Sequence, residues 1–238
     1  MFSAFYNIFI MEFVGIDKFS LLDYDNYISV VLFAPKCNFR CPFCHNGTTV
    51  LESHNSISFD EIVQFLQTRK GLVDAVVFTG GEPTLMPELK KRIETVKNLG
   101  FLIKLDTNGT NYSVLKDLLD SHLIDYVAMD IKNSFKCYPE TCGVDDFRQK
   151  NIEKSINLLR KNVVNYEFRT TLVNEYHNED SIIEMGKLLD GAHNLYLQKF
   201  VDREGVIKKG LHEVSYKKAI IFQKLLQKYI KDVKLRGY

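Results

Sequence analysis

The chain has 238 residues, of which 45% are hydrophobic and 26% are charged, as in an ordinary globular protein. Its formal net charge of +1 at pH 7 argues against a protein built mainly to bind nucleic acid. The opening MFSAFYNIFI is apolar, but it lacks a basic start, and Glu12 interrupts it well short of the about 18 residues of a membrane span. We therefore expect neither a signal peptide nor a membrane anchor.

A short β-branched or aromatic run followed by a longer helical pattern recurs along the chain, as in parallel βα units. The runs predict six strands, at residues 28–34, 73–79, 101–106, 126–131, 166–173 and 195–200. The patterns that follow them predict six helices, at residues 58–71, 87–99, 112–121, 147–161, 180–189 and 214–233. We predict an α/β fold in which these units form a partial (βα)6 barrel with a parallel sheet.

No repeat or Pro/Gly/Ser-rich linker marks a domain boundary. Met11 offers a second possible start of the chain. We therefore expect residues 1–12 to be an extension that the fold can spare, and residues 13–238 to form a single domain.

The unusual motifs of the chain lie at the ends of the predicted strands or directly after them. In a partial barrel of parallel strands, these segments all reach one rim, which is where such folds place their chemistry. The sequence therefore predicts one composite site at the carboxyl ends of the strands.

The loop after the first predicted strand, KCNFRCPFCHNG, contains Cys37, Cys41 and Cys44. Three of the five cysteines within eight residues indicate metal ligation and a reducing compartment, so we expect a cytoplasmic protein. Three thiols are one short of a closed tetrahedral site. Either a fourth protein ligand lies nearby or the metal keeps an open position.

Three kinds of site fit this loop. A zinc ion could take His45 as its fourth ligand, although adjacent Cys44 and His45 would have difficulty reaching one small ion together. Cys41 to His45 also matches the C-x-x-C-H pattern of c-type haem attachment, which leaves Cys37 unexplained. A cubane iron–sulfur cluster held by three thiolates would leave one iron free for an external ligand.

The spacing C-x3-C-x2-C, with the aromatic Phe43 before the last cysteine, resembles the radical S-adenosylmethionine (SAM) superfamily. The resemblance implies that Cys37, Cys41 and Cys44 hold a [4Fe–4S] cluster whose open iron chelates SAM. Residues 13–238 would then be one radical SAM domain.

Gly80-Gly81-Glu82, after the second predicted strand, resembles the GGE motif of that superfamily. There the glycines permit a close backbone approach, and the carboxylate receives the amino group of SAM. On its own the motif is equally compatible with a Gly-Gly turn before a helix.

Two further motifs resemble those of glycyl-radical-enzyme activases. Asp106-Thr107-Asn108 follows the third predicted strand, and Asp130 and Lys132 close the fourth. The resemblance implies that the acids help to hold a monovalent cation or the methionine end of SAM, with the lysine near its carboxylate. A simple Asn-Gly turn and a surface ion pair are the competing interpretations.

The resemblance extends to three more residues: Arg169, in the fifth predicted strand, His45 and Gln198. From about Phe13 to Phe200, the chain resembles the activating proteins of anaerobic ribonucleoside-triphosphate reductase. It departs from the pyruvate formate-lyase activase pattern at Val201, where that branch tends to have a histidine.

These resemblances imply an oxidoreductase that cleaves SAM reductively to a 5′-deoxyadenosyl radical, which takes a hydrogen atom from a glycine of a partner protein. The expected partner is a glycyl radical enzyme, anaerobic ribonucleoside-triphosphate reductase first, with flavodoxin or ferredoxin as the electron donor. The alternatives are a pyruvate formate-lyase activating enzyme, a radical SAM enzyme acting on a small molecule, and a zinc-stabilised binding module.

Overall fold

The structure is a computed structural model that describes residues 12–47, 51 and 56–238. The described residues form one eight-stranded sheet whose strands follow the order of the sequence. The first two strands are antiparallel, and every later pair of neighbours is parallel. The strands are β1 (Gly15–Ser20), β2 (Ser29–Ala34), β3 (Ala75–Gly80), β4 (Leu102–Thr107), β5 (Tyr126–Asp130), β6 (Asn165–Leu172), β7 (Asn194–Lys199) and β8 (Asp232–Arg236).

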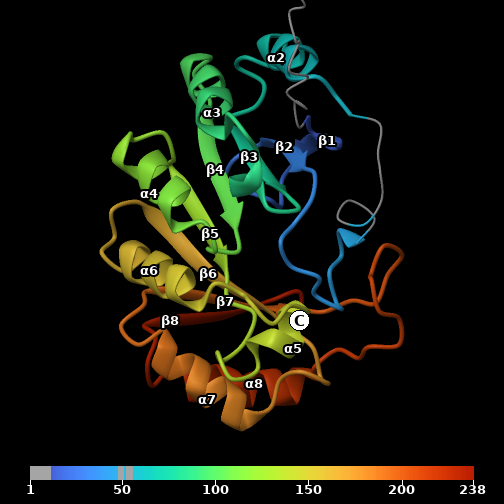
Figure 1. The fold of residues 1–238 in the computed structure, drawn as a ribbon, viewed down its shortest axis with the longest axis vertical. Coiled ribbons are helices and arrows are strands. Elements are labelled where there is room, and N and C mark those ends of the chain that lie inside the picture. Colours follow the sequence, from blue (N-terminus) through green and yellow to red (C-terminus); the bar gives the residue numbers. More distant parts are fainter. Residues whose placement is uncertain (1–11, 48–50, 52–55) are drawn as a thin grey trace, which may run out of the picture.

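A helix follows each strand from β2 to β7, so the predicted (βα)6 arrangement is confirmed. These helices are α2 (Phe59–Gln67), α3 (Leu89–Asn98), α4 (Tyr112–Asp120), α6 (Gln149–Leu159), α7 (Glu179–Leu188) and α8 (Tyr216–Leu226). Figure 1 shows the sheet curving from β1 and β2 round to β8, with the helices along its outside. Among the described residues, no helix is long and apolar enough to cross a membrane.

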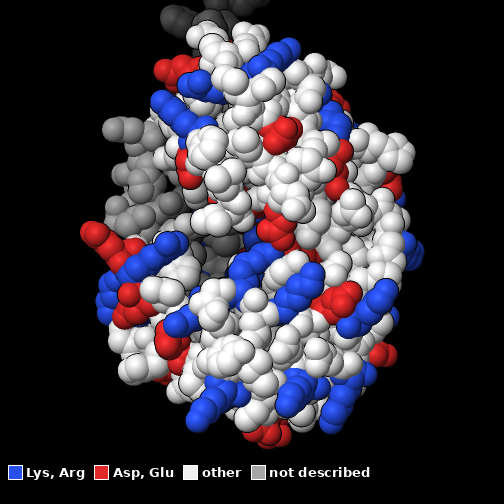
Figure 2. Space-filling model, turned by 180° about the vertical axis from the view of Figure 1, so that it is seen from behind, with Lys and Arg blue, Asp and Glu red and all other residues white. Residues whose placement is uncertain are grey.

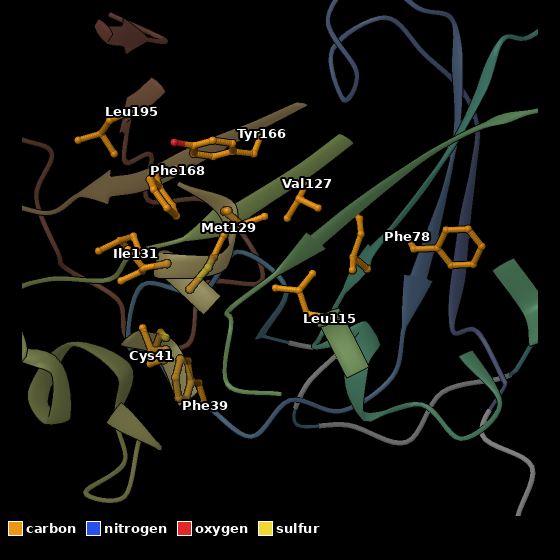
Figure 3. Packing of buried hydrophobic residues seen from close by; sticks show 14 of the residues in the cluster. Phe39, Cys41, Phe78, Leu115, Val127, Met129, Ile131, Tyr166, Phe168 and Leu195 are labelled. Atoms are coloured by element: carbon orange, nitrogen blue, oxygen red, sulfur yellow. The ribbon is translucent and has the colours of Figure 1, made fainter. Parts of the chain in front are cut away.

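The curved sheet has two faces of different character because successive side chains of a strand point to opposite sides. In β2, Val30 and Leu32 belong to the main core under the helices, whereas Val31 lies in a small cluster on the inner face. Figure 3 shows the main core between strands and helices, with Phe78 of β3 and Phe168 of β6 in it. The inner face is therefore left for polar side chains nearer the carboxyl ends of the strands.

A capping box forms at Ser58, at the start of α2. The Ser58 hydroxyl accepts a hydrogen bond from the Glu61 backbone N–H at 3.3 Å, and the Glu61 carboxylate accepts one from the Ser58 N–H at 3.0 Å. Two backbone donors at the helix start are thereby satisfied. Ile62 and Leu66 of this helix are buried in the main core.

The structure corrects the prediction at both ends of the sheet. β1 was not predicted, and the helix predicted over residues 214–233 ends at Leu226, after which residues 232–236 form β8. Val233 is buried between two exposed neighbours, which is the alternation of a strand rather than of a helix. A short helix, α5 (Tyr138–Cys142), also lies in the region predicted as a loop.

Most of the predicted N-terminal extension, residues 1–12, lies outside the described residues. Glu12 itself contacts the body of the protein, because its carboxylate accepts a hydrogen bond from the Phe59 N–H at 3.1 Å and pairs with Arg92 at 3.4 Å. A dispensable extension would therefore end at residue 11. This boundary and the single domain that follows it stay predictions.

Candidate active site

The predicted site residues lie together around a cavity of about 510 Å³ at the carboxyl ends of the parallel strands. Each of them lines this cavity: Cys37, Cys41, Phe43, Cys44, His45, Gly80, Gly81, Glu82, Asp106, Thr107, Asn108, Asp130, Lys132, Arg169 and Gln198. The loops that follow the parallel strands thus meet at one rim, as the sequence predicts.

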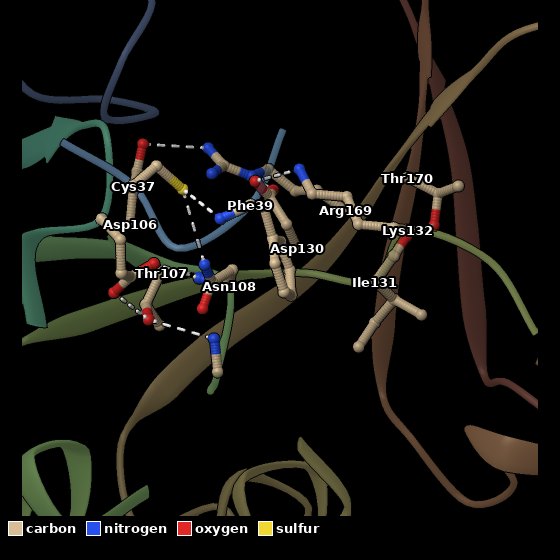
Figure 4. Close-up of polar contacts among 12 residues, drawn as sticks. Cys37, Phe39, Asp106, Thr107, Asn108, Asp130, Ile131, Lys132, Arg169 and Thr170 are labelled. Carbon is tan, nitrogen blue, oxygen red and sulfur yellow. Dashed lines mark hydrogen bonds and ion pairs between the residues drawn. The ribbon is translucent and has the colours of Figure 1, made fainter. Parts of the chain in front are cut away.

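The cysteine loop brings three thiols to the cavity wall. Cys41 is buried, while Cys37 and Cys44 are half-buried. The Cys37 sulfur accepts a hydrogen bond from the Phe39 N–H at 3.3 Å, and the Asn108 amide nitrogen lies 3.8 Å from it, as Figure 4 shows. The loop after β4 therefore reaches the first cysteine.

Burial raises the pKa of all three thiols, that of Cys37 to about 11, so they are neutral at pH 7 in the absence of a cation. The nearby positive charge of Lys132 opposes this shift. Among the described residues, no three His, Cys, Asp or Glu side chains lie close enough together to hold one metal ion. The thiols line a cavity rather than converge on one point.

The Gly-Gly turn after β3 packs against the start of the cysteine loop. A Cβ atom on Gly81 would lie 1.8 Å from the Lys36 carbonyl oxygen, and one on Gly80 would lie 2.5 Å from the Ala34 nitrogen. The Glu82 N–H also donates to the Lys36 carbonyl at 2.8 Å. These two glycines are therefore required for the contact between the two loops, and the close backbone approach that the motif implies is made to the cysteine loop.

Glu82 joins the loops after β3 and β4. Its carboxylate accepts hydrogen bonds from the Thr84 N–H and hydroxyl at 3.2 and 2.5 Å, from the Thr107 hydroxyl at 2.7 Å and from the Asn108 N–H at 2.7 Å. Burial raises the pKa of Glu82, and these donors oppose the rise. Because a backbone N–H donates to each carboxylate oxygen, the arrangement suits the ionised form.

Five charged side chains on the inner face form one network, in which Lys104 of β4 pairs with Asp106 at 3.5 Å, and Figure 4 shows part of it. Arg169 of β6 pairs with Asp106 of β4 at 3.1 Å and with Asp130 of β5 at 3.0 Å. Lys132 pairs with Asp130 at 3.0 Å. Although burial disfavours the charge, Arg169 and Lys132 hold the pKa of Asp130 below its usual range. The ion pair considered from the sequence is present, and the same side chains line the cavity.

His45 lies between the cysteine loop and the end of β7. Its ring stacks on Phe200 with centroids 5.5 Å apart and planes 6° apart, and its Nε2 lies 2.9 Å from the Val201 carbonyl oxygen. Burial lowers the pKa of His45, although the Val201 carbonyl opposes this. The neutral ring therefore donates to Val201 through Nε2.

A model of the radical SAM superfamily matches residues 31–189, which span the cysteine loop and the strands that carry the charged network. The chain belongs to the radical SAM superfamily. It is 36% identical over 231 residues to a Methanocaldococcus jannaschii protein named as a candidate glycyl-radical enzyme activating enzyme, which covers 93% of this chain and 94% of the relative.

One further relative agrees with this assignment, and one solved structure shares the fold. A pyruvate formate-lyase-activating enzyme of Clostridium pasteurianum is 31% identical over 132 residues, or 50% of this chain and 55% of that enzyme. Streptococcus suis SuiB bound to S-adenosylmethionine superposes with a TM-score of 0.66 at 16% identity, covering 86% of this chain and 51% of SuiB. The latter likeness shows the fold. Together the findings identify a radical SAM enzyme of the glycyl-radical activase family.

Radical SAM enzymes use a [4Fe–4S] cluster and SAM, and the cavity fits both. A donor set made only of thiols is the set that iron–sulfur clusters take, and binding requires the thiolate forms, which iron favours over the neutral thiols. The polar wall contributed by Asp106, Asp130, Lys132 and Arg169 suits a ligand with both an amino and a carboxylate group.

Sequence reasoning missed several residues of this radical SAM site. Asn38 accepts a hydrogen bond from the Asn108 side chain at 2.9 Å, and Asn46 donates to the Gly80 carbonyl at 2.9 Å. Arg203 and Ile207, from the loop after β7, also line the cavity. The two asparagines lie next to the cysteine motif in the sequence, so their place in the site could have been predicted. The loop after β7 carries no recognisable pattern.

Proposed function

We propose that this radical SAM enzyme generates a glycyl radical on a partner protein, and that the partner is an anaerobic ribonucleoside-triphosphate reductase. The observation that carries the proposal is the likeness over 93% of the chain to a protein named as a glycyl-radical enzyme activating enzyme. The three thiols and the charged network, which share one cavity, support it.

In this proposal Cys37, Cys41 and Cys44 would hold the cluster, which would supply the one electron needed to cleave SAM to methionine and a 5′-deoxyadenosyl radical. Hydrogen transfer then leaves 5′-deoxyadenosine and a radical on the glycine of the partner. The residues of the chain bind, orient and shield the reactants. Glu82 fixes the loops around SAM, and Lys132 places a positive charge where the carboxylate of SAM would bind.

The charged network bears on the proposed monovalent cation. Asp106 and Asp130 are both paired with Arg169, and each has a second cationic partner, Lys104 and Lys132 respectively, so their negative charge is already balanced by protein cations. An added cation would have to share these carboxylates with Arg169. We therefore propose that the two acids mainly hold Arg169 and Lys132 in place. They would bind a monovalent cation only if that cation displaced one of the basic side chains.

We further propose that a flavodoxin or a ferredoxin donates the electron in the cytoplasm. The segment from His212 to Tyr238 carries seven Lys or Arg residues and two acidic residues. Figure 2 shows Lys and Arg side chains spread over the lower half of one face, at the height where Figure 1 shows α8 and β8. A basic surface of this kind attracts an acidic electron carrier.

The partner assignment predicts which protein acquires the radical. The reduced enzyme and SAM are incubated anaerobically with an anaerobic ribonucleoside-triphosphate reductase or with a pyruvate formate-lyase, preferably from the same genome. Electron paramagnetic resonance should show a glycyl radical doublet on the reductase. A doublet on the lyase alone would overturn the partner and keep the activase, while a doublet on neither, with SAM cleaved, would point to a different substrate.

A further inference from the structure

The loop after β7 lies directly on the cysteine loop. Residues 201–210, called the strap below, make two backbone hydrogen bonds to it: the Gly47 N–H donates to the Gly205 carbonyl at 3.0 Å, and the Lys208 N–H donates to the Pro42 carbonyl at 2.8 Å. The Nε2 of His45 also reaches the Val201 carbonyl at 2.9 Å. Figure 1 shows the two segments, in blue and in orange, meeting on the side away from α4.

The strap keeps its own shape through contacts near its two ends. The Gly210 N–H donates to the Asp202 carboxylate at 3.0 Å, and the Lys209 ammonium donates to the Arg203 carbonyl at 2.6 Å. Val206 is buried, which anchors the middle of the strap. Such a loop is a compact unit rather than a loose connection.

Close packing adds to the hydrogen bonds between strap and cysteine loop. A Cβ atom on Gly47 would lie 2.3 Å from the Gly205 carbonyl oxygen and 2.8 Å from Cγ1 of Ile207. There is thus no room for any side chain at position 47. Ile207 also lines the cavity, so one residue of the strap contacts both the cysteine loop and the site.

The residues held by the strap stand next to two of the three thiols in the sequence. Pro42 follows Cys41 directly, and His45 follows Cys44. Fixing the chain next to each of these cysteines limits how their sulfurs can move. An apolar side chain at the cavity wall also limits the access of water to whatever the thiols bind.

We propose that the strap is a positioning element that holds the Cys41–Cys44 turn in its ligating conformation and covers the cluster from solvent through Ile207. The inference rests on the proposed ligation of the cluster by Cys37, Cys41 and Cys44. It names Gly47, at the end of the cysteine loop, and Ile207, which belongs to none of the motifs that the sequence singles out, as the residues on which the cover depends.

Three variants test this role. Ile207→Ala removes the apolar cover without changing any residue of the cysteine loop, while Gly47→Ala pushes the strap away through the clash with Gly205. Glu204→Ala is the matched control, because it changes an exposed residue of the strap that does not line the cavity. Each protein is reconstituted anaerobically, and cluster loss to an iron(II) chelator is followed by the fading of its visible absorbance.

Both test variants should assemble a cluster but lose it about tenfold faster than the wild type, as is typical when groups around a metal site are removed. Their cluster potential should also change, because exposure to solvent is one of its determinants. Glu204→Ala should behave as the wild type. In metal-free protein, Gly47→Ala should speed hydrogen exchange within residues 201–210, a readout that needs no cluster.

Equal rates of cluster loss in the wild type and in Ile207→Ala would overturn the proposal that Ile207 covers the cluster. Unchanged exchange in Gly47→Ala would overturn the contact itself. A wild-type protein that assembles no cluster would instead contradict the proposed ligation, so the two failures are distinguishable.

Discussion

Arg169 is the residue on which the charge balance of the cavity depends. Its side chain is 13% exposed, and it pairs with Asp106 and Asp130, which are 10% and 28% exposed. A buried charge that loses its partner is strongly disfavoured, because water cannot replace the lost interaction. Arg169 therefore stabilises the fold at the same place where it lines the cavity.

Arg169→Met should lower the free energy of unfolding by about 3 kcal/mol, because two poorly solvated carboxylates each lose one of their two cationic partners. Lys187→Met is the control, since its pair with Glu184 is more than half exposed and should contribute far less to stability. Urea unfolding of the metal-free proteins measures both. Equal effects would show that the buried network does not stabilise the protein.

Glu82 is the second residue whose substitution has a definite expected effect. Glu82→Gln keeps the size of the side chain but places an NH2 group among donors, so at least one of the hydrogen bonds from Thr84, Thr107 or Asn108 is lost. The affinity for SAM should fall about tenfold, as expected for the loss of a charge-assisted hydrogen bond. Equilibrium binding of SAM to the reconstituted protein tests this, and an unchanged affinity would remove Glu82 from the site.

The identity of the site residues could be predicted from sequence, but their neighbours could not. The Gly-Gly-Glu motif located Gly81 at the cavity, whereas its closest contact is the Lys36 carbonyl in another loop. Such contacts depend on how two loops meet in space. A single sequence contains the local pattern of each loop but does not indicate which loops contact each other.

At the scale of elements, prediction succeeded where the pattern was regular. The parallel strands from β2 to β7 are short apolar runs, and each lies within two residues of its predicted bounds. The final segment failed because its apolar residues suit a helical stripe up to residue 233. The edge strand β8 is stabilised by pairing with β7, a tertiary contact that overrides the local pattern.

His177 joins the ends of β5 and β6. Its Nδ1 accepts a hydrogen bond from the Val173 N–H at 3.1 Å, and its Nε2 donates to the Lys132 carbonyl at 3.0 Å. Burial lowers the pKa of His177, with the two backbone contacts opposing the shift. The neutral ring is therefore the form that the fold requires.

This predicts a loss of stability in acid. The unfolded chain binds a proton on this histidine near its ordinary pKa of about 6.5, whereas the folded chain does so only at lower pH. The contribution is thus present above about pH 6.5 and is lost as the pH falls below it. The urea midpoint should differ less between pH 7.5 and pH 5.5 in His177→Gln than it does in the wild type. The exposed His193→Gln should keep the wild-type difference, and an unchanged difference in His177→Gln would contradict the role.

At the scale of the whole molecule, the curved sheet brings distant segments together. Arg236 of β8 pairs with Glu167 of β6 at 3.0 Å and reaches Asp25, in the loop after β1, at 3.4 Å. The loop after the first strand thus reaches the last strand across the inner face. The convergence of the strand ends could be predicted from the repeated βα pattern. The positions of β1, β8 and the strap could not, because long-range contacts determine them.

The central claim is that Cys37, Cys41 and Cys44 hold the cluster with which the enzyme cleaves SAM. The most direct measurement is the 5′-deoxyadenosine formed from SAM by anaerobically reconstituted, dithionite-reduced protein, with two variants alongside. The wild type and Cys137→Ser, which changes a cysteine outside the cavity lining, should form product. Cys41→Ser should form none. The claim would be contradicted if Cys41→Ser formed product at the wild-type rate. It would also be contradicted if the wild type, with a verified cluster and its partner present, formed no product.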